Sequence, residues 1–198
     1  AGGDPMKPAA FDYACPENVG EALTLLAERG AAARICAGGQ SLGSMMNLRL
    51  VTPEVLIDIA GLSELKSIAL VGGAIEVGAA VTQAEFLAWP DLASFQPLLA
   101  KMLPWIGHYQ TRQRGTVCGS LAHGDPSSEL PLALALLRGE VLLASRRGRR
   151  VVSAEDFQLG MMATDIREDE MIVAARLPVA QVGAASAFHE VAQRHGDF

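Results

Sequence analysis

Residues 114–126 read RGTVCGSLAHGDP, and a second glycine-bearing stretch, AGGQSL, occupies residues 37–42. Glycines leave backbone N–H groups open to a ligand, and the neighbouring serine and threonine hydroxyls add further hydrogen-bonding groups. Such groups bind phosphate oxygens, above all where a helix begins. Two stretches of this kind in one short chain predict a ligand with two phosphates held between them, which is the chemistry of a dinucleotide cofactor.

The first stretch is a weak signal by itself, because a glycine pair at the end of a strand is usually a turn. Its position strengthens the prediction. A short apolar strand at 34–37 leads into Gly38 and Gly39, and an apolar helical run at 42–48 follows Ser41. N–H groups left open between a strand and a helix would face an anion, with some help from the helix dipole.

The second stretch is the stronger signal. Gly115 and Gly119 allow close backbone approach, whereas Thr116 and Ser120 supply hydroxyls. Asp125 and the proline after it start a new turn. A capped connection without any ligand would explain Asp125, but it does not explain the whole run of small residues that precedes it.

The composition is that of a folded, acidic globular protein. The chain has 198 residues, half of them hydrophobic, which is enough for one or two small domains with a core. Its formal net charge of -6 argues against nucleic acid or an anionic membrane as the main partner. No apolar run reaches the roughly 18 residues of a membrane span, and no signal peptide is visible, so we expect a cytoplasmic protein.

The cysteines are not arranged for a disulfide or a metal. Cys15, Cys36 and Cys118 are odd in number and form no C-x-x-C pair. An iron–sulfur cluster of the [2Fe–2S] type normally takes more cysteines than these. We therefore expect no metal site in this chain, and the sequence offers no Ser-His-Asp constellation for catalysis.

Hydrophobic periodicity and turn residues predict an α+β protein. Residues 1–5 are interpreted as a cloning remnant or a processed leader, residues 6–60 as a small β-α-β subdomain and residues 61–198 as a larger sheet-and-helix subdomain. The predicted helices lie at 18–29, 42–48, 82–89, 97–106, 129–138 and 154–157. The predicted strands lie at 34–37, 55–59, 65–71, 74–79, 141–144, 151–152, 171–177 and 184–193.

In their order and spacing these motifs resemble the FAD-binding medium subunit of molybdenum hydroxylases. That family includes the flavoprotein subunits of carbon monoxide, nicotinate and quinoline dehydrogenases and the flavin domain of xanthine dehydrogenase. The resemblance covers nearly the whole chain from Met6 onward. It includes the residues 11–13, 37–50, 77–82, 114–131, 157, 160–170 and 194–197.

The resemblance implies a two-subdomain FAD-binding fold of the vanillyl-alcohol-oxidase and molybdopterin-dehydrogenase type, with FAD in the cleft between the subdomains. The family's C-terminal domain is absent from the sequence, so a truncated or processed fragment is expected. The first stretch would wrap the pyrophosphate, the second would contact the pyrophosphate and the flavin side, an acidic residue would bind a cofactor hydroxyl, and two isoleucines would add flavin contacts. These residues are Ala37, Gly38, Gly39, Gln40, Ser41 and Leu42; Thr116, Gly119 and Ser120; Asp125 or Glu129; and Ile106 and Ile166.

Two positions depart from the family pattern. Cys118 stands where a second glycine is common, which makes backbone approach there less certain. His189 or Glu190 stands where some relatives carry a lysine near the flavin, so no role is transferred to that position.

The function that the resemblance implies is electron transfer in a heterotrimer. A molybdenum-cofactor large subunit would oxidise the substrate, a [2Fe–2S] small subunit would relay electrons, and this oxidoreductase subunit would pass them through FAD to an external acceptor. Since the cofactor does the chemistry, no catalytic side chain is nominated. Two alternatives stay open: a stand-alone FAD-dependent oxidase or dehydrogenase, and a non-catalytic interaction fragment.

Two further groups have competing interpretations. His108 and Tyr109 could flank a flavin ring or form a solvated turn. The arginines at 146, 147, 149 and 150 most simply form a solvated hairpin turn, and the alternative is a docking surface for an acidic partner.

Overall fold

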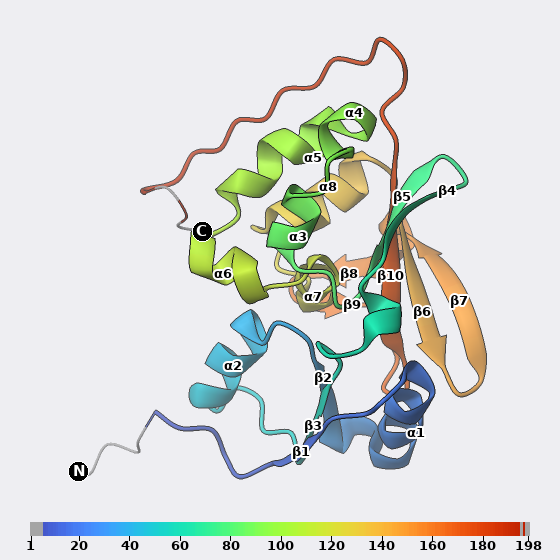
Figure 1. Ribbon diagram of the computed structural model, residues 1–198. Helices are drawn as coiled ribbons and strands as arrows, with labels where there is room; N and C mark the ends of the chain where they lie inside the picture. Colours follow the sequence, from blue (N-terminus) through green and yellow to red (C-terminus); the bar gives the residue numbers. More distant parts are fainter. Residues whose placement is uncertain (1–5, 195, 197–198) are drawn as a thin grey trace.

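The computed structural model describes residues 6–194 and 196 (Figure 1). The interpretation of residues 1–5, and the part of the C-terminal motif at 195 and 197–198, lie outside the described residues. Within the described part of the chain the strands form a three-stranded sheet, a five-stranded sheet and a two-stranded hairpin. Helices and sheets together confirm the α+β class.

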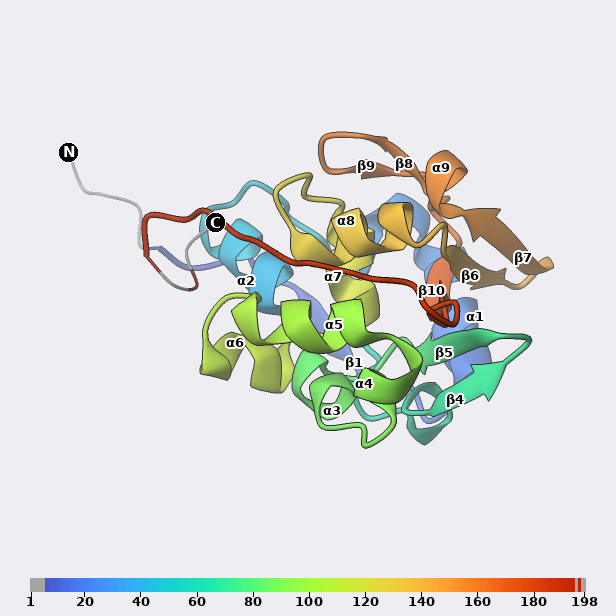
Figure 2. The same ribbon diagram turned by 90° about the horizontal axis from the view of Figure 1, so that it is seen from above.

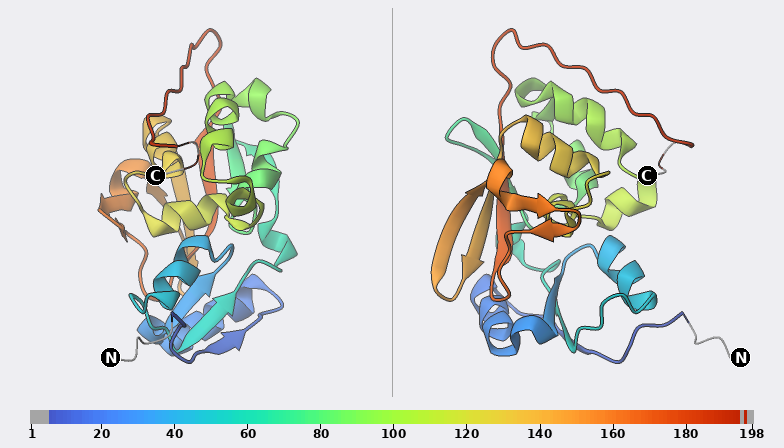
Figure 3. Two further views of the ribbon diagram at one scale, coloured as in Figure 1. Left: turned by 90° about the vertical axis from the view of Figure 1, so that its left-hand side faces the viewer. Right: turned by 180° about the vertical axis from the view of Figure 1, so that it is seen from behind.

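The N-terminal part is a parallel sheet with two helices, and it lies at one end of the larger part (Figure 3). Its first helix begins at Asn18, whose side-chain oxygen accepts a hydrogen bond from the Glu21 N–H at 2.9 Å, and ends at Gly30 with a φ of 51°. Both ends are as predicted. The elements are β1 (Asp12–Ala14), α1 (Val19–Arg29), η1 (Gly30–Ala32), β2 (Ala33–Cys36), α2 (Gln40–Asn47) and β3 (Val55–Asp58), and the sheet order is β1-β3-β2.

The larger sheet is antiparallel throughout. Its central strand is buried along most of its length, and the helices between residues 83 and 136 gather on one face of it (Figure 1). Apolar side chains of this sheet and of these helices belong to one hydrophobic core, which fixes the helices that approach the first glycine stretch. The strands are β4 (Ile68–Val71), β5 (Ala74–Gly78), β6 (Glu140–Ser145), β7 (Gly148–Ser153) and β10 (Met171–Pro178), in the order β4-β5-β10-β6-β7, with β8 (Gln158–Gly160) and β9 (Ala163–Thr164) as the separate hairpin.

Several helices begin at side-chain caps. Thr82 and Glu85 form a reciprocal capping box, and Ser153 accepts from the Asp156 N–H at 3.2 Å. The helix predicted at 97–106 divides before Pro104, whose ring disfavours a continuous helix. The helices are α3 (Gln83–Leu87), α4 (Leu92–Phe95), α5 (Pro97–Met102), α6 (Tyr109–Arg114), α7 (Val117–His123), α8 (Glu129–Leu136) and α9 (Ala154–Phe157), with single turns at η2 (Ser63–Leu65) and η3 (Leu103–Trp105).

The second glycine stretch is mostly a helix rather than an open loop. Thr116 caps α7, and Gly124 ends it in the left-handed conformation with a φ of 66°. Glycine and serine lower helix propensity, which is why the local pattern does not indicate this helix.

The strand predicted at 184–193 is wrong. The segment runs as extended chain over the helical layer (Figure 2), where no strand edge of the described sheets is available to pair with it. It is held instead by Lys101 Nζ, which donates to the Ser186 carbonyl at 2.8 Å, and by the rings of Trp105 and Phe188, 6.3 Å apart. Among the described helices, none combines the length and hydropathy that crossing a membrane requires.

Candidate functional site

The first glycine stretch presents open backbone donors. Gly39 adopts the left-handed conformation, with a φ of 67°, and is the N-cap of α2 without any side-chain cap. Within the described residues, the N–H groups of Gln40, Ser41 and Leu42 donate to no protein acceptor. Three such groups at the start of a helix form an anion-binding arrangement.

The two glycine stretches are in direct contact. A Cβ atom at Gly38 would overlap the carbonyl group of Arg114, lying 2.7 Å from its carbon, and would lie 2.8 Å from the Cα of Gly115. The side chain of Gln40 also reaches this point, since its Cγ lies 3.5 Å from the position of a Cβ at Gly115. Glycine at 38 is therefore required for the two backbones to meet, and the open donors of α2 lie beside the second stretch.

The second stretch has already used most of its polar groups. Thr116 Oγ1 accepts from the Gly119 N–H at 3.0 Å, and the Val117 N–H donates to the Val81 carbonyl at 3.2 Å. Ser120 and Ser128 share a hydroxyl–hydroxyl hydrogen bond of 3.0 Å. These contacts hold α7 against the connection between β5 and α3 and against the start of α8. The polar groups of this stretch therefore serve chiefly to fix its own position.

The departure at Cys118 does not obstruct the site. The side chain is 2% exposed and its thiol donates to the Val77 carbonyl at 3.6 Å, so it points into the core. Burial raises the pKa of Cys118 to about 12, which keeps the thiol neutral.

The structure distinguishes the two acidic candidates. Asp125 accepts from both the N–H and the hydroxyl of Ser127, at 2.9 and 2.7 Å, and these bonds lower the pKa of Asp125. Glu129 is 9% exposed, and its Oε2 has no hydrogen-bond partner within residues 6–194. Burial raises the pKa of Glu129, and the carboxylates of Glu190 and Asp125 add to the rise. A buried acceptor without a donor fits a ligand hydroxyl, so Glu129 suits the predicted role better than Asp125.

The two isoleucines occupy different environments. Ile106 is 3% exposed within the core, and its carbonyl accepts from Arg112 Nη1 at 2.9 Å. Ile166 is half-buried and follows β9. This strand lies against the end of α7, since a Cβ at Gly124 would be 3.0 Å from the Thr164 methyl group. The nearby His108 and Tyr109 are exposed at the start of α6.

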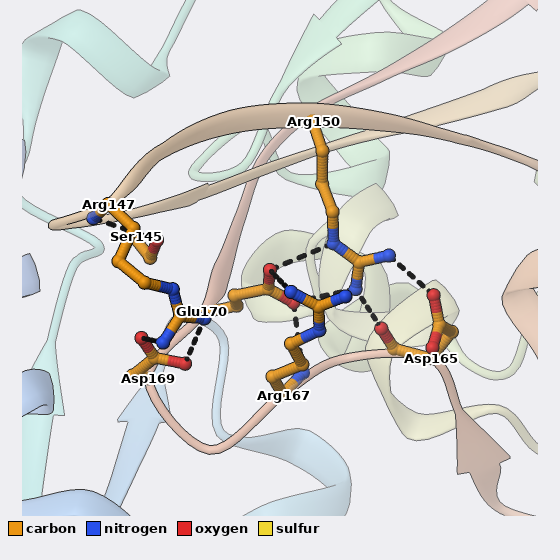
Figure 4. Close-up of polar contacts among 7 residues, drawn as sticks. All are labelled: Ser145, Arg147, Arg150, Asp165, Arg167, Asp169 and Glu170. Carbon is orange, nitrogen blue, oxygen red and sulfur yellow. Dashed lines mark hydrogen bonds and ion pairs between the residues drawn. The ribbon is translucent and has the colours of Figure 1, made fainter.

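Within the arginine cluster, the structure corrects the interpretation of Arg150 (Figure 4), whereas Arg146, Arg147 and Arg149 are exposed at the β6–β7 hairpin as predicted. Arg150 lies in β7 rather than in the turn and binds both carboxylate oxygens of Glu170, at 2.8 and 2.7 Å, as well as Asp165. Arg147 pairs with Asp169 at 2.6 Å. Together the two arginines connect β7 and the turn before it to the segment between β9 and β10. No local sequence pattern predicts such a long-range contact.

Sequence reasoning also missed Gln83, the first residue of α3. It is 4% exposed, and its N–H donates to the Gly115 carbonyl at 2.8 Å. Its position directly after the Thr82 cap predicts a helix start, but nothing in the pattern indicates that the side chain turns inward to the junction of the two stretches.

Comparison with known proteins gives consistent results. Residues 9–180 match the family described as the FAD binding domain in molybdopterin dehydrogenase. The chain is 37% identical over 193 residues to the 6-hydroxypseudooxynicotine dehydrogenase complex subunit alpha of Paenarthrobacter nicotinovorans, covering 98% of this chain and 65% of that protein. It is 36% identical to the carbon monoxide dehydrogenase medium chain of Hydrogenophaga pseudoflava, covering 98% and 67%.

A solved structure shows the same fold. A chain of carbon monoxide dehydrogenase from Hydrogenophaga pseudoflava, in a form lacking the Mo-pyranopterin moiety, superposes with a TM-score of 0.92 and 38% identity, over 96% of this chain and 67% of that one. The chain thus spans about two thirds of the length of these relatives, between 65% and 67%.

Proposed function

The chain belongs to the family of FAD-binding domains of molybdopterin dehydrogenases, and from that premise we propose that it is the flavin-binding part of the medium subunit of a molybdenum hydroxylase. Its proposed role is to pass electrons from a [2Fe–2S] partner subunit, by way of FAD, to an external acceptor. The names of its relatives, which are subunits or chains of dehydrogenases, support an oxidoreductase complex. The molybdenum cofactor that belongs to the similar carbon monoxide dehydrogenase supports a partner subunit that carries molybdenum.

The observation that carries the proposal is the contact between the two glycine stretches. It sets three open N–H groups, those of Gln40, Ser41 and Leu42, beside the backbone at Arg114 and Gly115. A pyrophosphate would find its donors at this junction, where the helix dipole of α2 also favours negative charge.

The other proposed contacts extend from the junction along α7 to α8. The subdomains 6–60 and 61–198 would contribute one stretch each, and the orphan oxygen of Glu129 would accept a sugar hydroxyl. The full proposed set is Ala37, Gly38, Gly39, Gln40, Ser41, Leu42, Ile106, Thr116, Gly119, Ser120, Asp125, Glu129 and Ile166. Of these, Thr116, Ser120 and Asp125 already have hydrogen-bonded side chains, and Ile106 is buried in the core.

When bound, FAD supplies the electron-carrying chemistry, and the protein supplies binding and orientation. The chain's own N–H groups would bind the phosphate oxygens by hydrogen bonds, and the Glu129 carboxylate would accept a hydrogen bond from a sugar hydroxyl. Ion pairs from Arg150 to Asp165 and Glu170 hold the segment 165–170, which includes Ile166, in place without a ligand. Binding would therefore not have to pay for ordering this segment.

The first test is cofactor binding by the 198-residue chain. We expect the purified chain to carry the visible absorption bands of oxidised flavin, or to acquire them on addition of FAD, and to release FAD on heat denaturation. A colourless chain that fails to quench the fluorescence of added FAD in a titration would contradict the proposal. Co-purification with a molybdenum-containing chain and an iron–sulfur chain from the source cells then tests the assignment to a multi-subunit hydroxylase.

A further inference from the structure

Gln83 carries a buried polar atom that the protein leaves without a partner. The residue is 4% exposed, and its Oε1 has no hydrogen-bond partner within the described residues. An amide oxygen removed from water without a donor is costly, and most buried side-chain polar atoms avoid this state.

The Gln83 side chain, whose Oε1 has no partner, ends where the two glycine stretches meet. The position of a Cβ at Gly115 lies 3.5 Å from Gln83 Cδ and 3.5 Å from Gln40 Cγ. The backbone fixes this arrangement, because the Gln83 N–H donates to the Gly115 carbonyl at 2.8 Å and Thr82 pairs with Thr116 in a β-bridge. Gln83 therefore cannot move away without disturbing the second stretch.

A second buried glutamine shows the ordinary arrangement. Gln96 is 3% exposed, and its Nε2 donates to the Pro178 carbonyl at 2.8 Å, which ties the start of α5 to the end of β10. The two residues have the same side chain and nearly the same burial, but Gln96 is engaged inside the protein through its amide, whereas the Gln83 oxygen is not.

We propose that Gln83 is a further ligand-binding residue, whose side-chain oxygen accepts a hydrogen bond from a sugar hydroxyl of the bound FAD. This inference rests on the proposed function. In FAD, hydroxyl-bearing sugar units flank the pyrophosphate on both sides, and the phosphates themselves offer no donor at neutral pH. An acceptor beside a pyrophosphate site is therefore matched by a neighbouring hydroxyl.

The test compares Gln83→Met with Gln96→Met in the 198-residue chain. Methionine preserves length and helix propensity and removes the amide at each site. For each variant, the FAD dissociation constant is measured by fluorescence titration, and the thermal midpoint is measured without FAD. We expect Gln83→Met to weaken FAD binding by roughly threefold to tenfold while the midpoint of the FAD-free chain stays the same or rises.

Gln96→Met should do the opposite: it should lower the midpoint of the FAD-free chain and leave the FAD dissociation constant unchanged. If Gln83→Met binds FAD as tightly as the unmodified chain, or if it loses stability as Gln96→Met does, the inference is overturned, because a water or a protein group then satisfies the oxygen. If the unmodified chain itself binds no FAD, it is the proposed function that has failed.

Discussion

At residues 40–42 the backbone N–H groups donate to nothing in the described protein, whereas at residues 117–120 the N–H groups of Val117, Gly119 and Ser120 are engaged within it. Both regions are rich in glycine and serine and both begin a helix. The first region follows the parallel strand β2 and lacks a side-chain cap, whereas the second is capped by Thr116 and bonded to the Val81 carbonyl in the connection between β5 and α3. Similar composition thus produces two different arrangements, open donors in one region and hydrogen-bonded, aligned backbone in the other.

The largest expected effect comes from breaking the contact between the regions with Gly38→Ala. The added Cβ would overlap the backbone carbonyl of Arg114, 2.7 Å from its carbon, so the two stretches must separate. We expect a loss of about 3 kcal/mol or more in unfolding free energy, at or above the usual cost of overpacking, together with loss of FAD binding. Urea unfolding and FAD titration measure the two effects.

Gly43→Ala is the matched control for that change. It lies inside α2, and a Cβ there would meet no atom within 4 Å. Alanine should leave stability unchanged or raise it by about 0.5–1 kcal/mol, as expected in a helix interior. Equal loss of stability from both substitutions would show that the segment 38–43 tolerates no added methyl group anywhere, and would contradict the argument from backbone contact.

Thr116→Val tests the scaffold role of the second region. Valine keeps the shape of the side chain but removes the oxygen that accepts from the Gly119 N–H at 3.0 Å. We expect the unfolding free energy to fall by about 1 kcal/mol, the usual cost of losing an N-cap. Thr24→Val removes a mid-helix hydroxyl in α1 whose hydrogen bonds, to Gly20 and Arg146, lie at the surface, and it should cost less; the reverse order would contradict the scaffold interpretation.

Glu129→Gln tests the buried carboxylate through its pH dependence. Because the folded-state pKa of Glu129 is raised, its ionisation weakens the folded state as pH rises above the ordinary glutamate pKa of about 4.3. The neutral variant should therefore be more stable than the unmodified chain at pH 7, with the difference fading as the pH falls toward about 4.3. Thermal midpoints across that range, measured without FAD, check the expectation; a difference independent of pH would contradict it.

The smallest expected effect is that of Ser41→Ala in the first region. This hydroxyl has no hydrogen-bond partner among the described residues, so stability should change by less than about 0.5 kcal/mol. Loss of one ligand contact should weaken FAD binding by roughly threefold to tenfold. Ser44→Ala, one turn away, removes a hydroxyl that donates to the Gln40 carbonyl at 3.2 Å and should leave FAD affinity unchanged.

The sequence predicts most of the local structure because the signals there are local. The predicted helices at 18–29 and 82–89 start at residues that cap them in the structure, Asn18 and Thr82, and the first of them ends at Gly30 as its predicted range requires. The helix α7 was not predicted, because glycine and serine hide a helix whose stability comes from its cap and its packing.

Long-range contacts were beyond the reach of local patterns. The strand predicted at 184–193 fails because pairing needs a free sheet edge, and the segment passes over helices instead. The solvated interpretation of Arg150 fails for a similar reason, since its partners Asp165 and Glu170 follow it only after β8 and β9. Both glycine stretches were identified from the sequence, but the contact that joins them, and the inward position of Gln83, depend on tertiary structure.

The clash that Gly38 avoids is with main-chain atoms, and this has a genetic consequence. Every amino acid has the same carbonyl group, so no replacement at position 114 can make room for a larger residue at position 38. A suppressor screen starting from an alanine at 38 should return reversion to glycine, and not second-site changes at 114. Glycine at 38 is thus a requirement that no change in the neighbouring side chains can relax.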